Sequence, residues 1–240
     1  IAPLNFSATF PCTCAIISLL SHTLLHVGQS YMHNKAMPSK NAIKIYAGDS
    51  YYHIYSRGVN KEPIFRSEED YVVFIGLFKR YLSRKIRRSP QRITYPHYAD
   101  TLSLICYALM PNHFHLFVFQ HDERVIEKFM RSLITSYSMY FNKKYDRVGP
   151  VFQSRYLALR MTDEAQFQHI TRYIHLNPRD WSISTHTSLD FFLGKRYAEW
   201  IHPERVLDMS PERYLKFLEE YSSKKSELDE MKWYLANQNE

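Results

Sequence analysis

The residues that could do chemistry begin with two histidines in the stretch Met110–Phe119, which reads MPNHFHLFVF. Alternate residues of a strand point to the same face, so His113 and His115 would project together while Phe114 turns into the core. Two neighbouring imidazoles on a rigid strand form half of a divalent-metal site, because histidine is the commonest metal ligand. The same spacing also occurs in strands whose histidines face solvent or make a single hydrogen bond. A metal site therefore requires a third ligand and a reactive group elsewhere in the chain.

Candidates for the third ligand and the reactive group occur in the second half of the chain. His169, Tyr173 and Asn177 recur every four residues, which places them on one face of the helix expected over residues 163–177. They lie at the edge of the apolar stripe of that helix, where a side chain can reach a site between helix and sheet. The residue types alone also allow a packed tyrosine and an asparagine that ends the helix before Pro178.

The elements that must position these residues follow a strand, helix, strand, strand, helix, strand order. Expected strands are 49–57, 102–109, the histidine-bearing stretch and 151–161, and expected helices are 67–85 and 123–144. This order is that of the ferredoxin-like and RRM-like arrangement, an antiparallel sheet with two helices on one face. The expected fold class is therefore α+β, and the opposite face is free for the extra helix that carries Tyr173.

The composition suits one substantial domain with appendages that binds a polyanion. The chain has 240 residues, and Lys and Arg outnumber Asp and Glu 31 to 24, a formal charge of +7. With 19 Tyr and 15 Phe, the chain favours single-stranded or distorted nucleic acid as its partner, although solubility alone would also explain the charge. Its 3 cysteines have the spacing of neither a zinc site nor a disulfide framework, which favours a reducing cytoplasm.

The chain divides into three expected parts. Residues 1–36 are expected to be a disordered extension or the product of a misassigned start, because they lie outside every motif. Their apolar patch is too short to span a bilayer, so no membrane partner is expected. Residues 37–180 hold all the motifs. Residues 181–240 are expected to be a mostly helical C-terminal extension, with one helix from 210 to about 221 and another at 227–235.

Four motifs carry a resemblance to a known family: YHIYSRG at 52–58, MPNHFHLF at 110–117, GPVFQSRY at 149–156 and RYIHLNP at 172–178. In this order and spacing, the chain resembles the HUH single-tyrosine transposases, and within them the REP-associated tyrosine transposases. The resemblance makes residues 37–180 an HUH transposase catalytic domain. It places the metal ligands of the family on His113, His115 and Asn177, and its nucleophile on Tyr173. Gln is frequent in the family where this chain has Asn177.

The resemblance implies a metal-dependent enzyme that cleaves and rejoins hairpin-flanked, single-stranded DNA. A divalent cation, Mg²⁺ or Mn²⁺, would polarise the scissile phosphate. Attack by Tyr173 would give a 5′-phosphotyrosine and a free 3′-hydroxyl, and His169, one turn earlier, is a candidate proton acceptor. The process would be DNA transposition or the mobilisation of REP-type repeats, and a homodimer is a candidate assembly.

Basic residues in and around the motifs are candidate DNA contacts. The densest group lies between residues 79 and 92, where the alternative is that cations simply favour a helix C-terminus. The candidate phosphate contacts are Arg57, Arg84, Lys85, Arg87, Arg88, Lys143, Lys144, Arg147, Arg155 and Arg172.

Two functions of other classes are weighed against the transposase. A non-catalytic nucleic-acid-binding protein on the same scaffold would stack bases on the sheet, and predicts a broken catalytic set. A nucleotide hydrolase or transferase with a His-x-His-x-His pattern would need a third histidine where the chain has Phe117.

Overall fold

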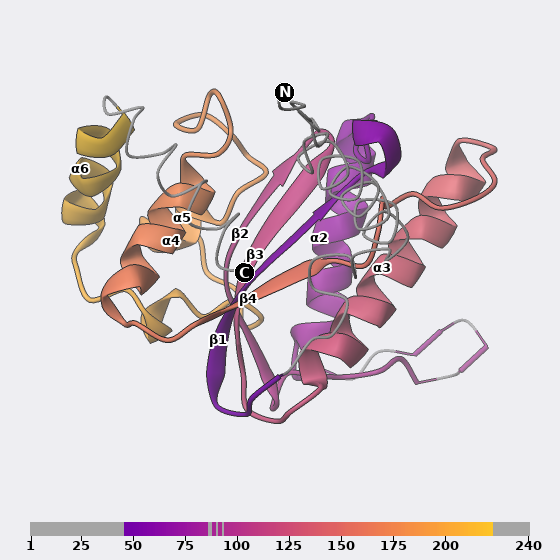
Figure 1. The fold of residues 1–240 in the computed structure, drawn as a ribbon, viewed down its shortest axis with the longest axis horizontal. Helices are drawn as coiled ribbons and strands as arrows, with labels where there is room; N and C mark the ends of the chain where they lie inside the picture. Colours follow the sequence, from indigo (N-terminus) through magenta and orange to yellow (C-terminus); the bar gives the residue numbers. More distant parts are fainter. Residues whose placement is uncertain (1–45, 86–87, 90, 93, 223–240) are drawn as a thin grey trace, which may run out of the picture. The chain divides into compact units, whose positions relative to one another are not determined.

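The computed structural model describes residues 46–85, 88–89, 91–92 and 94–222 of the chain (Figure 1). The expected extension at 1–36 and the helix expected at 227–235 lie outside the described residues. Among the helices that are described, none is long and apolar enough to cross a membrane.

The described part is built on a four-stranded antiparallel sheet. Its strands lie in the order β2-β3-β1-β4, and every neighbouring pair is antiparallel. Together with the helix positions, this is a ferredoxin-like arrangement, so the predicted α+β fold class is confirmed. The strands are β1 (Ser50–Arg57), β2 (Leu102–Met110), β3 (His113–Gln120) and β4 (Leu157–Met161).

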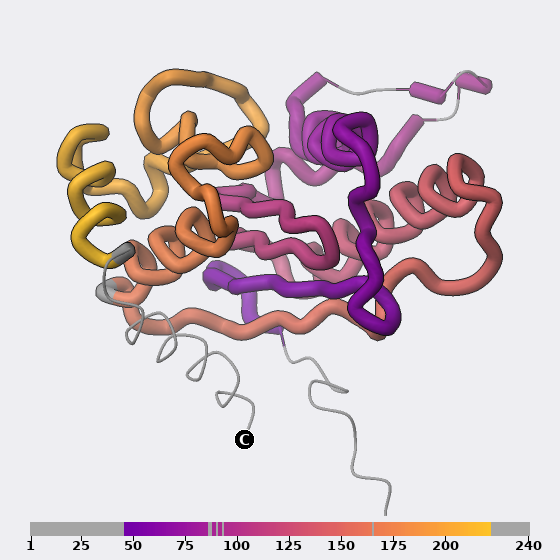
Figure 2. Tube along the Cα trace, turned by 90° about the horizontal axis from the view of Figure 1, so that it is seen from above, coloured from indigo at the N-terminus to yellow at the C-terminus, as the bar shows by residue number. Residues whose placement is uncertain are grey.

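Helices cover both faces of the sheet, as Figure 1 and Figure 2 show from two directions. α2 and α3 lie on one face, whereas α4, α5 and α6 gather on the other. All nine residues of β2 are buried, as its continuous apolar run predicts for a strand covered on both faces. The helices are α2 (Glu68–Leu82), α3 (Val125–Lys144), α4 (Ala165–His175), α5 (Leu189–Phe192) and α6 (Pro211–Ser222), with two 3-10 turns, η1 (Val59–Lys61) and η2 (Pro203–Arg205).

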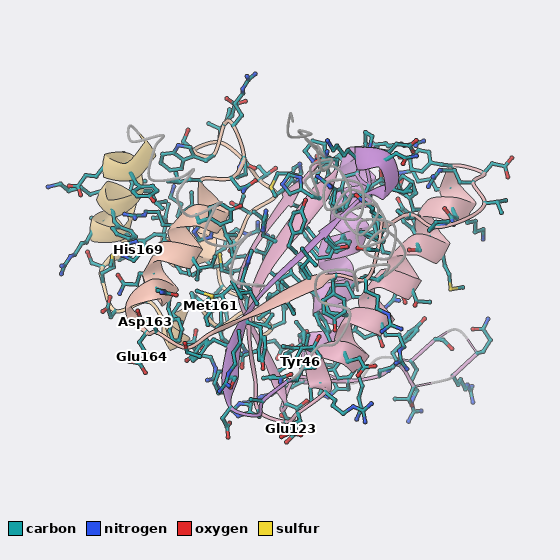
Figure 3. The ribbon with its side chains drawn as sticks, in the orientation of Figure 1. Tyr46, Glu123, Met161, Asp163, Glu164 and His169 are labelled. Atoms are coloured by element: carbon teal, nitrogen blue, oxygen red, sulfur yellow. The ribbon has the colours of Figure 1, made fainter. Side chains whose placement is uncertain are left out.

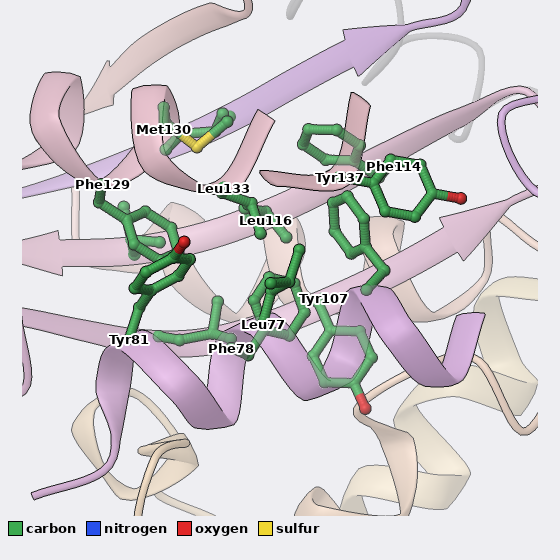
Figure 4. Close-up of a cluster of buried hydrophobic side chains, with 14 of the residues drawn as sticks. Leu77, Phe78, Tyr81, Tyr107, Phe114, Leu116, Phe129, Met130, Leu133 and Tyr137 are labelled. Carbon is green, nitrogen blue, oxygen red and sulfur yellow. The ribbon is translucent and has the colours of Figure 1, made fainter. Parts of the chain in front are cut away.

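α2 and α3 pack against one set of alternate strand residues to form a large aromatic core (Figure 4). Phe114 of β3 projects to this face, and its ring centroid lies 5.2 Å from that of Phe74 on α2. Tyr137 of α3 is fully buried, and its hydroxyl donates to the carbonyl oxygen of Ile64 at 2.5 Å. This core fixes the sheet from one side and contains none of the predicted site residues.

A second core lies on the other face. Phe117 of β3 packs there with Ile170 and Ile174, part of the apolar stripe predicted for α4. Tyr214 and Leu218 of α6 belong to the same core. Residues beyond 180 therefore pack together with α4, and the predicted division of the chain at 180 stays a prediction.

The edge strand β4 is shorter than the sequence predicts. Its ladder with β1 covers residues 157–161, so the prediction of a strand is wrong for 151–156. The amide of Gln153 donates to the carbonyl of Arg57 at 2.9 Å, and the next paired position is Leu157 opposite Tyr55. Residues 154–156 thus oppose the single residue Ser56, which is a bulge. The apolar pattern that holds a strand in register stops at the polar run Gln-Ser-Arg.

α4 begins and ends two residues inside its predicted bounds. It runs from 165 to 175 instead of 163 to 177, with Glu164 as its N-cap. Proline disfavours a helical conformation in the residue before it, so Pro178 ends the helix ahead of Asn177. The amide of Asn177 still donates to the carbonyl of Ile174 at 3.3 Å, which keeps Asn177 about one turn beyond Tyr173.

Candidate active site

β1 and β3 place polar side chains at one end of the sheet. Their register sets Arg57 opposite His113 and Tyr55 opposite His115. Directly opposed residues share a face, with β-carbons about 5 Å apart. The ring of Tyr55 lies 5.6 Å from that of His113 and 4.9 Å from that of His115. These four residues therefore form one polar group on the face that α4 covers.

α4 brings Tyr173 onto this group. The tyrosine ring stands edge-on to the His115 ring, with centroids 5.4 Å apart and planes at 87°. Its side chain is only 6% exposed because it also belongs to the second core. The predicted apolar stripe of α4 explains this position, since Ile170 and Ile174 beside Tyr173 seat the helix on the sheet.

His113 faces Asn177 in a way that suits a shared cation. Asn112 is oriented because its amide nitrogen donates to the carbonyl of Lys61 at 3.1 Å. Its Oδ1 then accepts from Nδ1 of His113 at 2.6 Å, which leaves a lone pair on Nε2. That Nε2 lies 3.3 Å from Oδ1 of Asn177. With Asn177 in this orientation, two acceptors point at each other, as ligands of one cation do.

His53, on β1, completes the group, although it is not one of the predicted site residues. Its Nε2 lies 2.8 Å from Nδ1 of His115, and the two rings are stacked with planes at 9°. When His115 donates through Nδ1, its Nε2 keeps a lone pair for a metal, and His53 fixes the ring. The available signal was the motif YHIYSRG, in which His53 alternates with Tyr55 and therefore shares its face.

Burial sets the protonation of this group. It lowers the pKa of His113 and, further, that of His115, and it lowers the pKa of His53 to about 3. All three imidazoles are therefore neutral near pH 7, the form that binds metals. Burial also raises the pKa of Tyr173 to about 12, against a hydrogen bond with Asn177 that lowers it. The phenol is protonated at neutral pH and requires activation to act as a nucleophile.

The donor set fits a catalytic divalent cation. No cluster of three His, Cys, Asp or Glu side chains with metal-site geometry occurs among the described residues. The candidate ligands are instead two imidazoles, His113 and His115, with the amide oxygen of Asn177. A set of three protein ligands leaves coordination positions for substrate, as catalytic metal sites do.

Comparison with protein families identifies the chain. The model of a family described as IS200-like transposases matches residues 49–177, more than half of the chain. The chain belongs to this family. The predicted relationship to single-tyrosine transposases is thereby confirmed.

This IS200-like transposase was also compared with solved structures and with curated proteins. A solved structure described as a REP-associated tyrosine transposase bound to a REP hairpin is similar to it, at 12% identity and a TM-score of 0.45. The similarity covers 70% of this chain and 94% of that one. The comparison with curated proteins gave no match.

In the transposase, two predicted residues of α4 face α6 and not the histidines. Arg172 is buried, and its guanidinium lies 3.4 Å from the ring centroid of Tyr221 and 4.2 Å from that of Phe217. Its Nη2 lies 2.8 Å from Nδ1 of His169. His169 is exposed on α4, as Figure 3 shows. The contacts of both residues therefore help to attach α6 to α4.

Other predicted DNA contacts differ in their partners. Arg57 donates through Nε and Nη2 to Oε1 of Gln153, at 3.3 and 3.2 Å. Lys144 is bound to Asp70 at 2.7 Å, and Arg147 lies 3.7 Å from Glu62. Lys143 and Arg155 are exposed, and neither takes part in the ion pairs found among the described residues.

The basic cluster after α2 lies at the far end of that helix. α2 starts close to the site, because the amide of Ile64 donates to the carbonyl of Pro111 at 2.7 Å. Its 15 residues then span about 22 Å at 1.5 Å per residue. Arg84, Lys85 and Arg88 follow this end and are exposed, whereas Arg87 lies outside the described residues.

Proposed function

We propose that this IS200-like transposase cleaves and rejoins single-stranded DNA beside a hairpin, with Tyr173 as the nucleophile. The observation that carries the proposal is the meeting of three elements at one point. Tyr173 of α4 stands edge-on to His115 of β3, and Asn177 lies 3.3 Å from Nε2 of His113. A packed tyrosine and a helix-ending asparagine would not require two neutral histidines beneath them.

The roles of the residues follow from their chemistry. His113, His115 and Asn177 would hold a divalent cation, Mg²⁺ or Mn²⁺, which supplies charge stabilisation to the scissile phosphate when bound. Tyr173 forms an oxygen–phosphorus bond, and the bond from phosphorus to the 3′-oxygen breaks. The 3′-oxygen takes a proton, and the bond energy is kept in the 5′-phosphotyrosine, so rejoining needs no ATP. His169 is the proposed proton acceptor, although its contacts with Arg172 and α6 require it to turn.

The substrate is proposed to be hairpin DNA of the REP type, which rests on the four motifs. Arg57 would contact the backbone beside the site, and Arg155 would contact the nucleotide next to it. Arg84, Lys85 and Arg88 would contact the backbone about one helix length away, and Arg87, Lys143, Lys144, Arg147 and Arg172 complete the proposed set. We place the reaction in the cytoplasm, and a homodimer is a proposed assembly.

The test is formation of the covalent adduct. A labelled single-stranded hairpin with flanking sequence and Mg²⁺ or Mn²⁺ should give a band that survives boiling and disappears with protease. Tyr173→Phe should bind the hairpin but form no band, because the ring is kept and the nucleophile is lost. The matched controls Tyr137→Phe, Tyr140→Phe and Tyr156→Phe should retain the band. Hairpin binding by wild type without any adduct would favour the non-catalytic binding protein.

A further inference from the structure

A pocket lies where residues 154–156 bulge away from β1. It has a volume of about 170 Å³ and lies between the motif YHIYSRG and the motif GPVFQSRY, whose second half forms the bulge. This volume is well below the roughly 300–1,000 Å³ of a site that encloses a whole small molecule, so the pocket accepts a single group. Its walls are Tyr55, Ser56, Arg57, Gln153, Ser154, Arg155 and Leu157.

The pocket adjoins the candidate active site. Tyr55 lines it, and the ring of Tyr55 lies 4.9 Å from that of His115. Arg57 lines it as well and is paired with His113 across β1 and β3. Neighbouring strands are about 5 Å apart, so a group in the pocket sits about one to two strand spacings from the histidines. A DNA strand whose phosphate lies on the histidines can therefore reach the pocket with the adjacent nucleotide.

The walls combine a ring, an apolar surface and two arginines. Tyr55 and Leu157 offer surfaces on which a base can stack, which a bare phosphate would not use. Arg57 is held in place because both its Nε and its Nη2 donate to Gln153. Arg57 and Arg155 bring donors only, and a donor-only guanidinium fork matches the two acceptors O6 and N7 of guanine.

We propose that this pocket reads one guanine base in the single strand next to the scissile phosphate. The inference rests on the proposed function, since it requires single-stranded DNA on the histidine site. It adds a specificity site for the DNA to the catalytic one. The bulge is what creates it, because a regular strand over 151–157 would fill the space with ladder contacts to β1.

The experiment measures binding without cleavage. The DNA is a set of hairpins with a single-stranded flank of thymidines, in which one dG replaces a thymidine at a different position in each. The full protein is added in EDTA, and its affinity for each hairpin is measured by fluorescence anisotropy. Wild type should bind tighter by about tenfold when dG stands at one particular position, as a bidentate arginine contact provides. Flanks with dA or dC at that position should bind like the thymidine flank.

Variants of Arg155 identify the contact. Arg155→Lys keeps the charge but loses the fork, so it should lose the dG preference while binding to the thymidine flank changes little. Arg160→Gln is the control, because Arg160 is an exposed arginine of the neighbouring strand β4 and is paired with Tyr52, which faces the other side of the sheet. It should keep the preference, and melting curves should show all variants folded.

Three results would overturn the proposal. The first is equal binding of all flanks by wild type that still forms the adduct, which refutes the base pocket but leaves the proposed function intact. The second is weaker binding to every flank, by the same factor, in Arg155→Gln but not in Arg155→Lys. This result would mean that Arg155 contacts a phosphate and not a base. The third is absence of any hairpin binding, which refutes the proposed function together with the pocket.

Discussion

Two buried polar clusters lie on opposite faces of the sheet, and they differ in how their hydrogen bonds are satisfied. On the face of α2 and α3, the carboxylate of Asp70 is fully buried and accepts bonds from Lys144, Tyr140, Tyr145 and two backbone amides. On the face of α4, Nε2 of His113 lies 3.3 Å from Oδ1 of Asn177, and both atoms are possible ligands of a cation. A cluster whose hydrogen bonds and charge are all satisfied by residues of the same chain stabilises the fold. A cluster of neutral imidazoles and an amide oxygen is instead suited to hold a cation.

The largest expected effect is loss of cleavage when the histidine cluster is broken. His113→Ala should lower the cleavage rate by about a thousandfold or more, since several kcal/mol of charge stabilisation depend on the bound cation. Thermal melting should stay close to wild type, because His113 is only half-buried and belongs to neither core. The measurement is adduct formation together with circular dichroism. Normal cleavage by both His113→Ala and His115→Ala would refute the two-histidine site.

A smaller effect on the same cluster is expected from His53→Phe. Loss of the partner that orients His115 should weaken Mn²⁺ binding by about 10–100-fold, while the ring keeps the packing. Isothermal titration calorimetry measures the affinity directly, and cleavage should recover at higher Mn²⁺ concentration. His202→Phe, at a partly exposed histidine far along the chain, is the control. Unchanged Mn²⁺ affinity in His53→Phe would mean that the His53 contact only fills space.

Breaking the satisfied cluster should change stability and leave the chemistry alone. Asp70→Asn removes a charged acceptor of several bonds and should lower the free energy of unfolding by about 3 kcal/mol. For a chain of this size that is a melting temperature lower by about 6–12 °C. Cleavage at a temperature where the variant is folded should match wild type. A cleavage defect in the folded variant would contradict the separation of the two clusters.

The same carboxylate predicts a dependence of stability on pH. Burial raises its pKa, but hydrogen bonds from Lys144, the backbone and two tyrosines outweigh this and lower the pKa of Asp70 from 3.8 to about 2. Its contribution is therefore complete above the unfolded pKa of 3.8 and is lost as the pH falls toward 2. Urea unfolding between pH 5 and pH 2 should show a steeper loss in wild type than in Asp70→Asn. Equal slopes would show that other carboxyls cause the acid unfolding.

The smallest effect is expected from the basic cluster beyond α2. Neutralising Arg84, Lys85, Arg87 and Arg88 together should flatten the plot of log affinity against log salt by about 0.7 per lost phosphate contact. Because the cluster lies at the far end of α2, the cleavage rate at saturating DNA should not change. An unchanged salt slope would mean that these residues are only a solvated helix end.

The sequence predicted the parts of the structure that depend on local periodicity. The alternation of His113 and His115 and the helical stripe through Ile170 and Ile174 follow from residue order, and the fold followed from the order of the elements. The contact between His53 and His115 did not, because it depends on the register of two strands 62 residues apart. Likewise, no local pattern predicted that Lys144 would reach Asp70, 74 residues away.

The bulge in the edge strand has a consequence for how copies of this protein meet. β4 is an outer strand of the sheet, and an open strand edge is a template on which another chain can pair and aggregate. Residues 154–156 interrupt that edge after only five ladder residues, and exposed Arg155 and Arg160 add charge to it. A continuous sheet running from one copy into the next across β4 is therefore disfavoured. The irregularity that shapes the pocket also protects the protein from edge-to-edge self-association.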